Sequence, residues 1–188
     1  MSGARRPPLR TFFALWPNPE TRDALARRAE QVAKASAGRP SRTDTLHLTL
    51  VFIGATPRER VAALRDLMDS IEVPRFALQF DQSGWWRHNG IAWAGARAAP
   101  DALFALQQAL ARGAEKIGFS LDVRPYVPHL TLARNALRSP SASMIPPLDW
   151  NVESFVLVAS ELTPDGARYR ILHESPLNEN FTITTASN

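Results

Sequence analysis

The tetrapeptide His-Leu-Thr-Leu occurs twice in this chain, at His47–Leu50 and at His129–Leu132. Its alternation of polar and apolar residues is typical of a β-strand with one buried face, because successive side chains of a strand point to opposite sides. We therefore expect the leucines to anchor each strand in the core. The histidine and the threonine share the other face, with Cα atoms roughly 6.5–7 Å apart. The fold must then hold two such strands in comparable surroundings.

The segments before the two motifs have a similar layout, in which a strand and a helix precede the motif strand. Phe13 lies 34 positions before His47 (47 − 13), and Ala92 lies 37 positions before His129 (129 − 92). These similar spans predict two related lobes, each carrying one motif.

The remaining pattern predicts alternating strands and helices. A helix should begin at the Asn18 cap and end near Gly38, a second should begin with a capping box at 56–59, and a third should follow Pro100 and stop at Gly118. The tight turn Asn89-Gly90 should join a strand at 76–80 to a strand that starts at Ile91. The other strands are expected at 9–16, 43–54, 125–133, 152–159 and 167–172.

The repeated motif suits chemistry at a phosphate. Displacement at phosphorus needs a base near the entering oxygen and an acid near the leaving one, and hydrogen-bond donors for the other oxygens. Two imidazoles and two hydroxyls, from His47, Thr49, His129 and Thr131, meet that demand if the lobes face each other. Arg134 could add positive charge to the same phosphate. Alternatively, the motifs are amphipathic strands whose polar positions have no catalytic role.

Composition limits the alternatives. The chain has no cysteine, which excludes disulfides, thiolate nucleophiles and cysteine-ligated metal centres. It shows no His-Glu-x-x-His pattern and no carboxylate–histidine cluster at ligand spacing, so we expect neither metal nor other cofactor. Its net charge of +4 favours polyanionic partners such as RNA or nucleotides. No apolar run approaches the roughly 20 residues of a membrane span, and no leader-like segment opens the chain, which predicts a cytoplasmic protein that does not enter membranes.

The motifs resemble the two His-x-Thr-x motifs of the two-histidine (2H) phosphoesterase superfamily. Within it, the chain is similar to the RNA 2′,3′-cyclic phosphodiesterases, also called 2′-5′ RNA ligases. The similarity covers nearly the whole chain: the opening strand at 9–16, the first motif with Phe52–Gly54, the segment 124–134 and the segment 160–177. One departure is Ser83-Gly84-Trp85-Trp86, where relatives tend to carry Gly-x-Phe-Pro.

The resemblance implies an α+β fold with two pseudo-symmetric lobes of antiparallel sheet, helices packed outside and a central cleft. It implies metal-independent hydrolysis of terminal 2′,3′-cyclic phosphates on RNA ends or nucleosides to 2′-phosphates. By motif position, His47 is expected to donate the proton to the departing 3′ oxygen and His129 to accept one from water. Thr49, Thr131 and Arg134 would bind the phosphate.

Two other functions remain open from the sequence. The same site could join RNA ends through a 2′-5′ bond, which is the reverse chemistry, or the cleft could bind RNA or nucleotides without turnover. We expect a monomer with one bilobal domain at 9–177, a flexible basic tail at 1–8 that contains Arg5 and Arg6, and a frayed tail at 178–188.

Several other residues invite a functional interpretation that the sequence does not favour. Trp85, Trp86 and Trp93 could stack on bases, but packing within the hairpin is the preferred interpretation. Strand alternation puts Phe52 on the leucine face, away from His47, unless a bulge intervenes. His88 and His173 are interpreted as solvated surface residues.

Overall fold

The computed structural model describes residues 7–122, 124–140, 146–164 and 166–179. Most of the predicted helices and strands are present, with boundaries shifted by a few residues. In chain order the elements are β1 (Leu9–Leu15), α1 (Pro19–Ser36), β2 (Arg39–Pro40), β3 (Leu48–Thr56), α2 (Val61–Asp69), β4 (Phe76–Phe80), β5 (Gln82–Trp86), β6 (Ile91–Gly95), α3 (Asp101–Lys116), β7 (Leu130–Arg134), β8 (Leu148–Val152), β9 (Ser154–Thr163) and β10 (Gly166–Pro176), with single 3₁₀ turns at Thr43–Thr45 and Arg58–Arg60.

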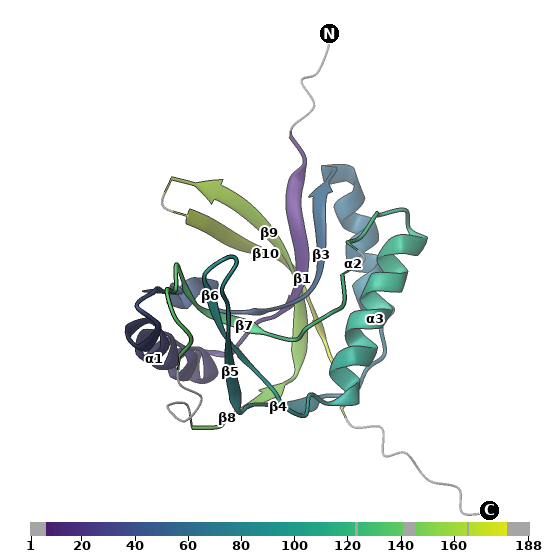
Figure 1. Cartoon of the computed structure of the whole chain (residues 1–188). Coiled ribbons are helices and arrows are strands. Elements are labelled where there is room, and N and C mark those ends of the chain that lie inside the picture. Colours follow the sequence, from purple (N-terminus) through teal and green to yellow (C-terminus); the bar gives the residue numbers. More distant parts are fainter. Residues whose placement is uncertain (1–6, 123, 141–145, 165, 180–188) are drawn as a thin grey trace, which may run out of the picture.

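The two motif strands lie in the middle of one antiparallel sheet. In the described residues the strand order is β10-β9-β1-β3-β7-β6-β5, with β2 on the side of β7, while β4 and β8 form a separate two-stranded sheet. The halves meet where Leu48 of β3 pairs with Leu130 of β7. The unit β1-α1-β3 thus faces the unit β6-α3-β7 across the centre of the sheet (Figure 1). This arrangement confirms the expected α+β fold with antiparallel sheet and the predicted structural duplication.

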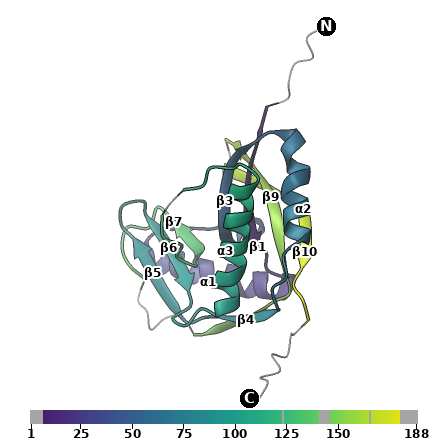
Figure 2. The ribbon, with the colours of Figure 1, turned by 90° about the vertical axis from the view of Figure 1, so that its right-hand side faces the viewer.

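The helices tie the two halves together. Helix α1 belongs to the first half in sequence but packs mainly against β7 of the second, and α3 of the second half packs against β3 of the first (Figures 1 and 2). Each helix therefore packs against the motif strand of the other half. Neither half buries its own helix alone, so the relative position of the two motif strands is fixed by packing from both sides.

The leucine face of the motifs is buried, as the strand alternation predicts. Leu46, Leu48, Leu50, Leu130 and Leu132 are at most 2 % exposed and belong to one hydrophobic core with the inner faces of α1 and α3. The opposite face of the sheet carries a second, smaller cluster of buried residues, namely Phe12, Ala14, Val156 and Val158, against which Trp16 and Tyr169 pack. Both faces of this part of the sheet are therefore covered, and the second face holds the candidate site.

The first helix begins as predicted and ends at Ser36, two residues before Gly38. The side chain of Asn18 accepts a hydrogen bond from the backbone N–H of Thr21 at 2.9 Å, which is an N-cap. The left-handed residue at the helix end is Ala37, with φ of 53°, and not Gly38. A Cβ on Gly38 would lie 3.0 Å from the carbonyl oxygen of Arg134, so the lack of a side chain at Gly38 allows the chain to pack closely against β7.

Two predictions about local structure are wrong. The hairpin turn at Asn89-Gly90 joins β5 to β6, and the predicted partner, β4, pairs with β8 instead. The expected capping box at 56–59 does not cap α2, which begins at Val61 after a 3₁₀ turn. The hydroxyl of Thr56 is bonded to that of Thr11 at 2.7 Å, and this buried bond between β3 and β1 holds it away from the helix.

The last described residues are still bonded to the rest of the domain. Asn178 still forms backbone hydrogen bonds with Val73 and Arg75, so the ordered region extends beyond Leu177. Residues 1–6, with Arg5 and Arg6, and residues 180–188 lie outside the described residues. None of the helices in the described ranges combines the length and apolar character needed to cross a membrane.

Candidate active site

The structure brings all five predicted site residues to one cavity. His47, Thr49, His129, Thr131 and Arg134 line a cavity of about 630 Å³ at the centre of the sheet, which we call the inner cavity. The candidate residues come from β3, β7 and the residues just before them, so the two motifs converge as the chemistry requires.

The register of the motif strands explains this convergence. Leu48 pairs with Leu130 in antiparallel orientation. When this register is extended by one residue to each side, the histidine of each motif stands opposite the threonine of the other, on the face away from the leucines. A single leucine pair in the core thus sets the relation between two imidazoles and two hydroxyls.

Both imidazoles are held by the same kind of hydrogen bond. Nδ1 of His47 lies 2.7 Å from the carbonyl oxygen of Thr45, and Nδ1 of His129 lies 2.8 Å from that of Val127. A carbonyl oxygen only accepts, so Nδ1 carries the proton in each ring, and Nε2 is left for proton transfer. Nε2 of His47 lies 3.1 Å from the hydroxyl of Thr49.

His47 lies in an aromatic pocket formed by the second cluster of the sheet. Its ring stacks on Trp16 at 5.4 Å between ring centroids, and it also contacts Phe12 and Tyr169 at 5.0 and 5.1 Å. Burial lowers the pKa of His47 to about 4, because the protonated ring would lose its hydration, and the hydrogen bond to Thr45 offsets this only in part. His47 is therefore neutral in the free protein at neutral pH.

His129 is less enclosed. The edge of its ring meets Trp86 at 4.5 Å between centroids, with an interplanar angle of 73°. Burial lowers the pKa of His129, the hydrogen bond to Val127 raises it, and the positive charge of Arg134 lowers it further. The same guanidinium also lowers the pKa of His47, which means that Arg134 acts on both rings.

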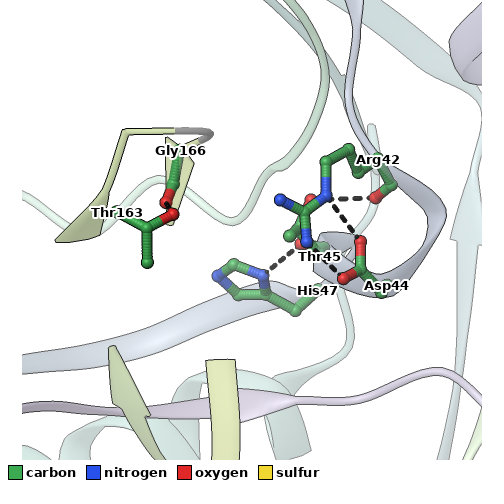
Figure 3. Close-up of polar contacts among 6 residues, drawn as sticks. All are labelled: Arg42, Asp44, Thr45, His47, Thr163 and Gly166. Atoms are coloured by element: carbon green, nitrogen blue, oxygen red, sulfur yellow. Dashed lines mark hydrogen bonds and ion pairs between the residues drawn. The ribbon is translucent and has the colours of Figure 1, made fainter. Parts of the chain in front are cut away.

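The inner cavity is strongly cationic. Arg10, Arg39 and Arg42 line it together with Arg134, and none of its described lining residues is acidic, although Asp44 forms an ion pair with Arg42 next to it. Nε of Arg42 is 3.0 Å from Oδ1 of Asp44, which orients this guanidinium (Figure 3). The turn between β9 and β10, with Thr163 and Gly166, lies on the other side of His47 in this view.

Three of these arginines act on Tyr169, a neighbour that sequence reasoning missed. Burial raises the pKa of the Tyr169 hydroxyl, while the charges of Arg134, Arg10 and Arg42 lower it. Four cationic side chains around one cavity can bind an anion. Arg134 was expected from the sequence, whereas Arg10, Arg39 and Arg42 were not, because they come from β1, β2 and the residue before the turn at Thr43–Thr45. Arg39 and Arg42 could have been suspected only from their closeness in sequence to the first motif.

Phe52 is a correction to the sequence analysis. It was expected on the leucine face, but it is 43 % exposed and lines the inner cavity. The pairing of β1 with β3 contains two register shifts, and Val51 is buried directly after Leu50, so the alternation changes between the motif and Phe52. The guanidinium of Arg10 lies 4.7 Å from the centre of the Phe52 ring.

The three tryptophans of the β5–β6 hairpin, Trp85, Trp86 and Trp93, have different surroundings. Trp93 covers Gly84, where a Cβ would come within 2.1 Å of the indole, and Nε1 of Trp85 donates to the carbonyl oxygen of Ala136 at 3.1 Å. Trp93 thus packs within the hairpin, as predicted, whereas Trp85 connects the hairpin to the segment after β7. Trp86 packs against Trp93 within the hairpin, as predicted, and its ring also contacts His129, so it lies beside the candidate site.

The other histidines do not join this cavity. His173 is bonded to Asp69 at 2.7 Å, and His88 is exposed near the β5–β6 turn. Within the described ranges, no three side chains among histidine, aspartate and glutamate gather in a way that could hold a metal ion.

Comparison with known proteins gives a consistent result. The model of the 2′-5′ RNA ligase superfamily matches residues 17–163. The RNA 2′,3′-cyclic phosphodiesterase of Escherichia coli (strain K12) is 34 % identical over 92 % of this chain and 98 % of its own length. The enzyme of the same name from Thermus thermophilus is 33 % identical over 90 % of each chain.

Solved structures agree. The crystal structure of E. coli LigT complexed with 3′-AMP has a TM-score of 0.80 at 34 % identity, covering 92 % of this chain and 99 % of that one. The structure of E. coli LigT complexed with phosphate has a TM-score of 0.79 at 31 % identity, covering 93 % of this chain and all of that one.

Proposed function

From the premise that this chain belongs to the 2′-5′ RNA ligase superfamily, we propose that it is an RNA 2′,3′-cyclic phosphodiesterase whose acid–base pair is His47 and His129. The main support for the proposal is that the imidazole rings of His47 and His129 are held by the same kind of hydrogen bond. Each is held through Nδ1 by a backbone carbonyl, so that Nε2 is left for chemistry, and both line one arginine-rich cavity.

The substrate is a terminal 2′,3′-cyclic phosphate on RNA or on a nucleoside. Its phosphate monoanion suits four guanidinium groups, and the complexes of E. coli LigT with 3′-AMP and with phosphate support this class of ligand. In the proposal, the hydroxyls of Thr49 and Thr131 and the guanidinium of Arg134 bind the non-bridging oxygens. These donors stabilise the negative charge that develops when the fifth oxygen approaches phosphorus.

Access to the two rings supports an assignment of roles. The ring of His47 is packed among Phe12, Trp16 and Tyr169 and lines the inner cavity, whereas His129 lines the inner cavity and also a second cavity. A general base must meet the water that enters, so His129 is the proton acceptor and His47 the donor to the departing 3′ oxygen. The product is a 2′-phosphate with a free 3′ hydroxyl.

The acid needs a proton that the free protein does not hold at neutral pH. With a pKa of about 4, His47 is neutral before substrate binds. A bound phosphate anion favours the charged imidazole, since an opposite charge nearby raises the pKa of a histidine. Substrate binding and protonation of His47 are therefore coupled in the proposed mechanism.

We extend the proposal to the setting of the enzyme. It acts as a cytoplasmic monomer without metal, and residues 9–177 form the catalytic domain between a basic tail at 1–8 and a C-terminal tail. These points follow from the sequence expectations. Gel filtration with light scattering measures the oligomeric state, and full activity in EDTA is the expected response to metal removal.

The proposed function is tested with adenosine 2′,3′-cyclic phosphate in buffer that contains EDTA. Product analysis should give the 2′-phosphate. His47→Asn and His129→Asn keep an N–H at the position of Nδ1 but remove Nε2, and each should lower kcat by roughly 10²–10⁴. His173→Asn is the matched control, because His173 lines neither cavity.

The outcomes separate cleanly. Activity close to wild type in either motif variant contradicts the assignment of that histidine. Tight binding of the 2′-phosphate product without turnover of the cyclic substrate would identify a binding module instead.

A further inference from the structure

Two arginines stand directly opposite each other on neighbouring strands at the inner cavity. Strand β2 consists of Arg39 and Pro40, and Arg39 pairs with Arg134 of β7 in antiparallel register. Paired residues of an antiparallel ladder point to the same face, and their strands lie roughly 5 Å apart. Both side chains are exposed and line the inner cavity. The proposed function places Arg134 at the reacting phosphate and leaves the individual role of Arg39 open.

This pairing is unfavourable unless an anion lies near it. Like charges that face each other across two strands repel, which lowers the stability of the sheet. The ion pairs among the described residues include neither Arg39 nor Arg134. By contrast, Arg42 is paired with Asp44, and the guanidinium of Arg10 lies over an aromatic ring. Of the four arginines at the inner cavity, Arg39 and Arg134 are therefore the pair whose repulsion a bound anion would relieve.

The segment around Arg39 is fastened to the second motif strand. The backbone N–H of Ser41 donates to the carbonyl oxygen of Leu132 at 2.8 Å, and its hydroxyl donates to the carbonyl oxygen of Thr131 at 2.9 Å. On the other side of Arg39, the lack of a side chain at Gly38 allows close packing against β7. The backbone of Arg39 is thus held in a defined position relative to the motif that carries Thr131.

Arg39 is farther from the two imidazoles than Arg134. The positive charge of Arg134 lowers the pKa of both His47 and His129, whereas the charge of Arg39 is not among the causes of either shift. Since the interaction between charges weakens with distance, Arg134 is the arginine beside the reacting phosphate. The inner cavity, at about 630 Å³, has the size of a site for a whole ligand and extends beyond that phosphate to Arg39.

The chemistry of RNA supplies a second anion at this place. The phosphate nearest to a terminal 2′,3′-cyclic phosphate is the one that links the last nucleotide to the preceding nucleotide, and it carries one negative charge. We propose that Arg39, beside Arg134, binds this second phosphate and makes an RNA end a better substrate than a nucleoside 2′,3′-cyclic phosphate. This inference rests on the proposed function and names the part of the RNA chain that Arg39 recognises.

Three substrates separate the second phosphate from the rest of the RNA chain. They are adenosine 2′,3′-cyclic phosphate, uridylyl-3′,5′-adenosine 2′,3′-cyclic phosphate, and the same dinucleotide with an uncharged methylphosphonate linkage. The linkage ratio is kcat/KM for the phosphate-linked dinucleotide divided by kcat/KM for the methylphosphonate-linked one, so it reports the charge alone. In the wild type this ratio should be about five, which is the size of one contact between exposed charges.

The Arg39→Gln variant removes the charge that the proposal requires. Its linkage ratio should fall close to one, because the two dinucleotides then differ little in their contacts with the protein. Arg112→Gln is the matched control, since Arg112 is exposed on α3, lines neither the inner cavity nor the second one, and changes the net charge by the same amount. This control should keep the linkage ratio of the wild type.

The salt dependence gives a second measurement. In the wild type, the logarithm of the linkage ratio should fall against the logarithm of the salt concentration with a slope of about −0.7, the value for one phosphate contact on a single strand. The slope should vanish in Arg39→Gln and persist in Arg112→Gln. A slope that is the same in both variants would show that the net charge of the protein, and not Arg39, attracts the second phosphate.

The remaining outcomes separate this inference from the proposed function. Equal linkage ratios in the wild type and in Arg39→Gln overturn the second phosphate site, and so does a wild-type ratio close to one, which requires no variant. Both results leave the phosphodiesterase intact when the wild type hydrolyses adenosine 2′,3′-cyclic phosphate. Absence of hydrolysis of all three substrates by the wild type refutes the proposed function, and the second phosphate site is refuted with it.

Discussion

Replacement of His47 by asparagine is expected to weaken the dependence of stability on acid pH. The pKa of His47 is about 4 in the folded protein, against 6.5 for an unperturbed histidine. Between these values the unfolded chain binds a proton that the folded protein does not, so the free energy of unfolding falls as the pH falls. The full difference corresponds to about 3 kcal/mol, lost by the wild type between neutral pH and pH 4.

Asparagine isolates this contribution. It does not titrate, and its amide N–H can still donate to the carbonyl oxygen of Thr45, which accepts from His47 at 2.7 Å. The carboxylates whose pKa is lowered, Asp44, Asp69 and Asp122, also lose stabilising contacts in acid, but they do so equally in both proteins. The difference between the two pH profiles therefore belongs to His47.

The assay is urea denaturation followed by tryptophan fluorescence at pH 7 and at pH 4.5, where most of the effect is already present. The wild type should lose more stability than His47→Asn between these pH values, by roughly 2–3 kcal/mol. His129→Asn serves as the comparison, because burial lowers the pKa of His129 too, although its ring is less enclosed. This variant should also lose less stability in acid than the wild type. Equal losses in the wild type and in His47→Asn would refute the idea that the aromatic pocket keeps His47 neutral.

Three further predictions concern activity and local packing. The pKa values of His47 and His129 both lie below 6.5 in the free protein, so the form with one proton on the two rings becomes scarcer as the pH rises. In steady-state assays, kcat/KM should therefore fall about tenfold per pH unit from pH 7 to 9. A flat pH profile would contradict this prediction. Ala37 has a φ of 53°, a left-handed conformation that glycine adopts more easily than alanine. Ala37→Gly should therefore raise the free energy of unfolding by about 0.4–1 kcal/mol. A loss of stability in urea denaturation would show that the left-handed turn is not strained. Gly84→Ala should lower the free energy of unfolding by about 1–3 kcal/mol in the same assay, because the new Cβ would lie 2.1 Å from the ring of Trp93. An unchanged free energy of unfolding would mean that the indole can move away.

The sequence by itself determined the parts of the site that depend on local alternation. In a strand, a histidine and a threonine two residues apart share a face whatever the rest of the chain does, and the leucines between them must be buried. The two motifs, their burial pattern and the presence of both histidines, both threonines and Arg134 at one cavity could therefore be predicted. The Asn18 cap and the stop at Gly118 were predictable for the same local reason.

Only the tertiary structure decided the surroundings of the two motif histidines. Phe52 turns into the inner cavity because the pairing of β3 with β1 shifts register, and such a shift depends on the partner strand. Arg10, Arg39 and Arg42 meet Arg134 only when distant segments are packed together, and α1 and α3 cross between the halves to hold them there. The charge of the inner cavity and the low pKa of His47 are properties of that packing, because electrostatic and desolvation effects depend on distance in space and not on separation along the chain.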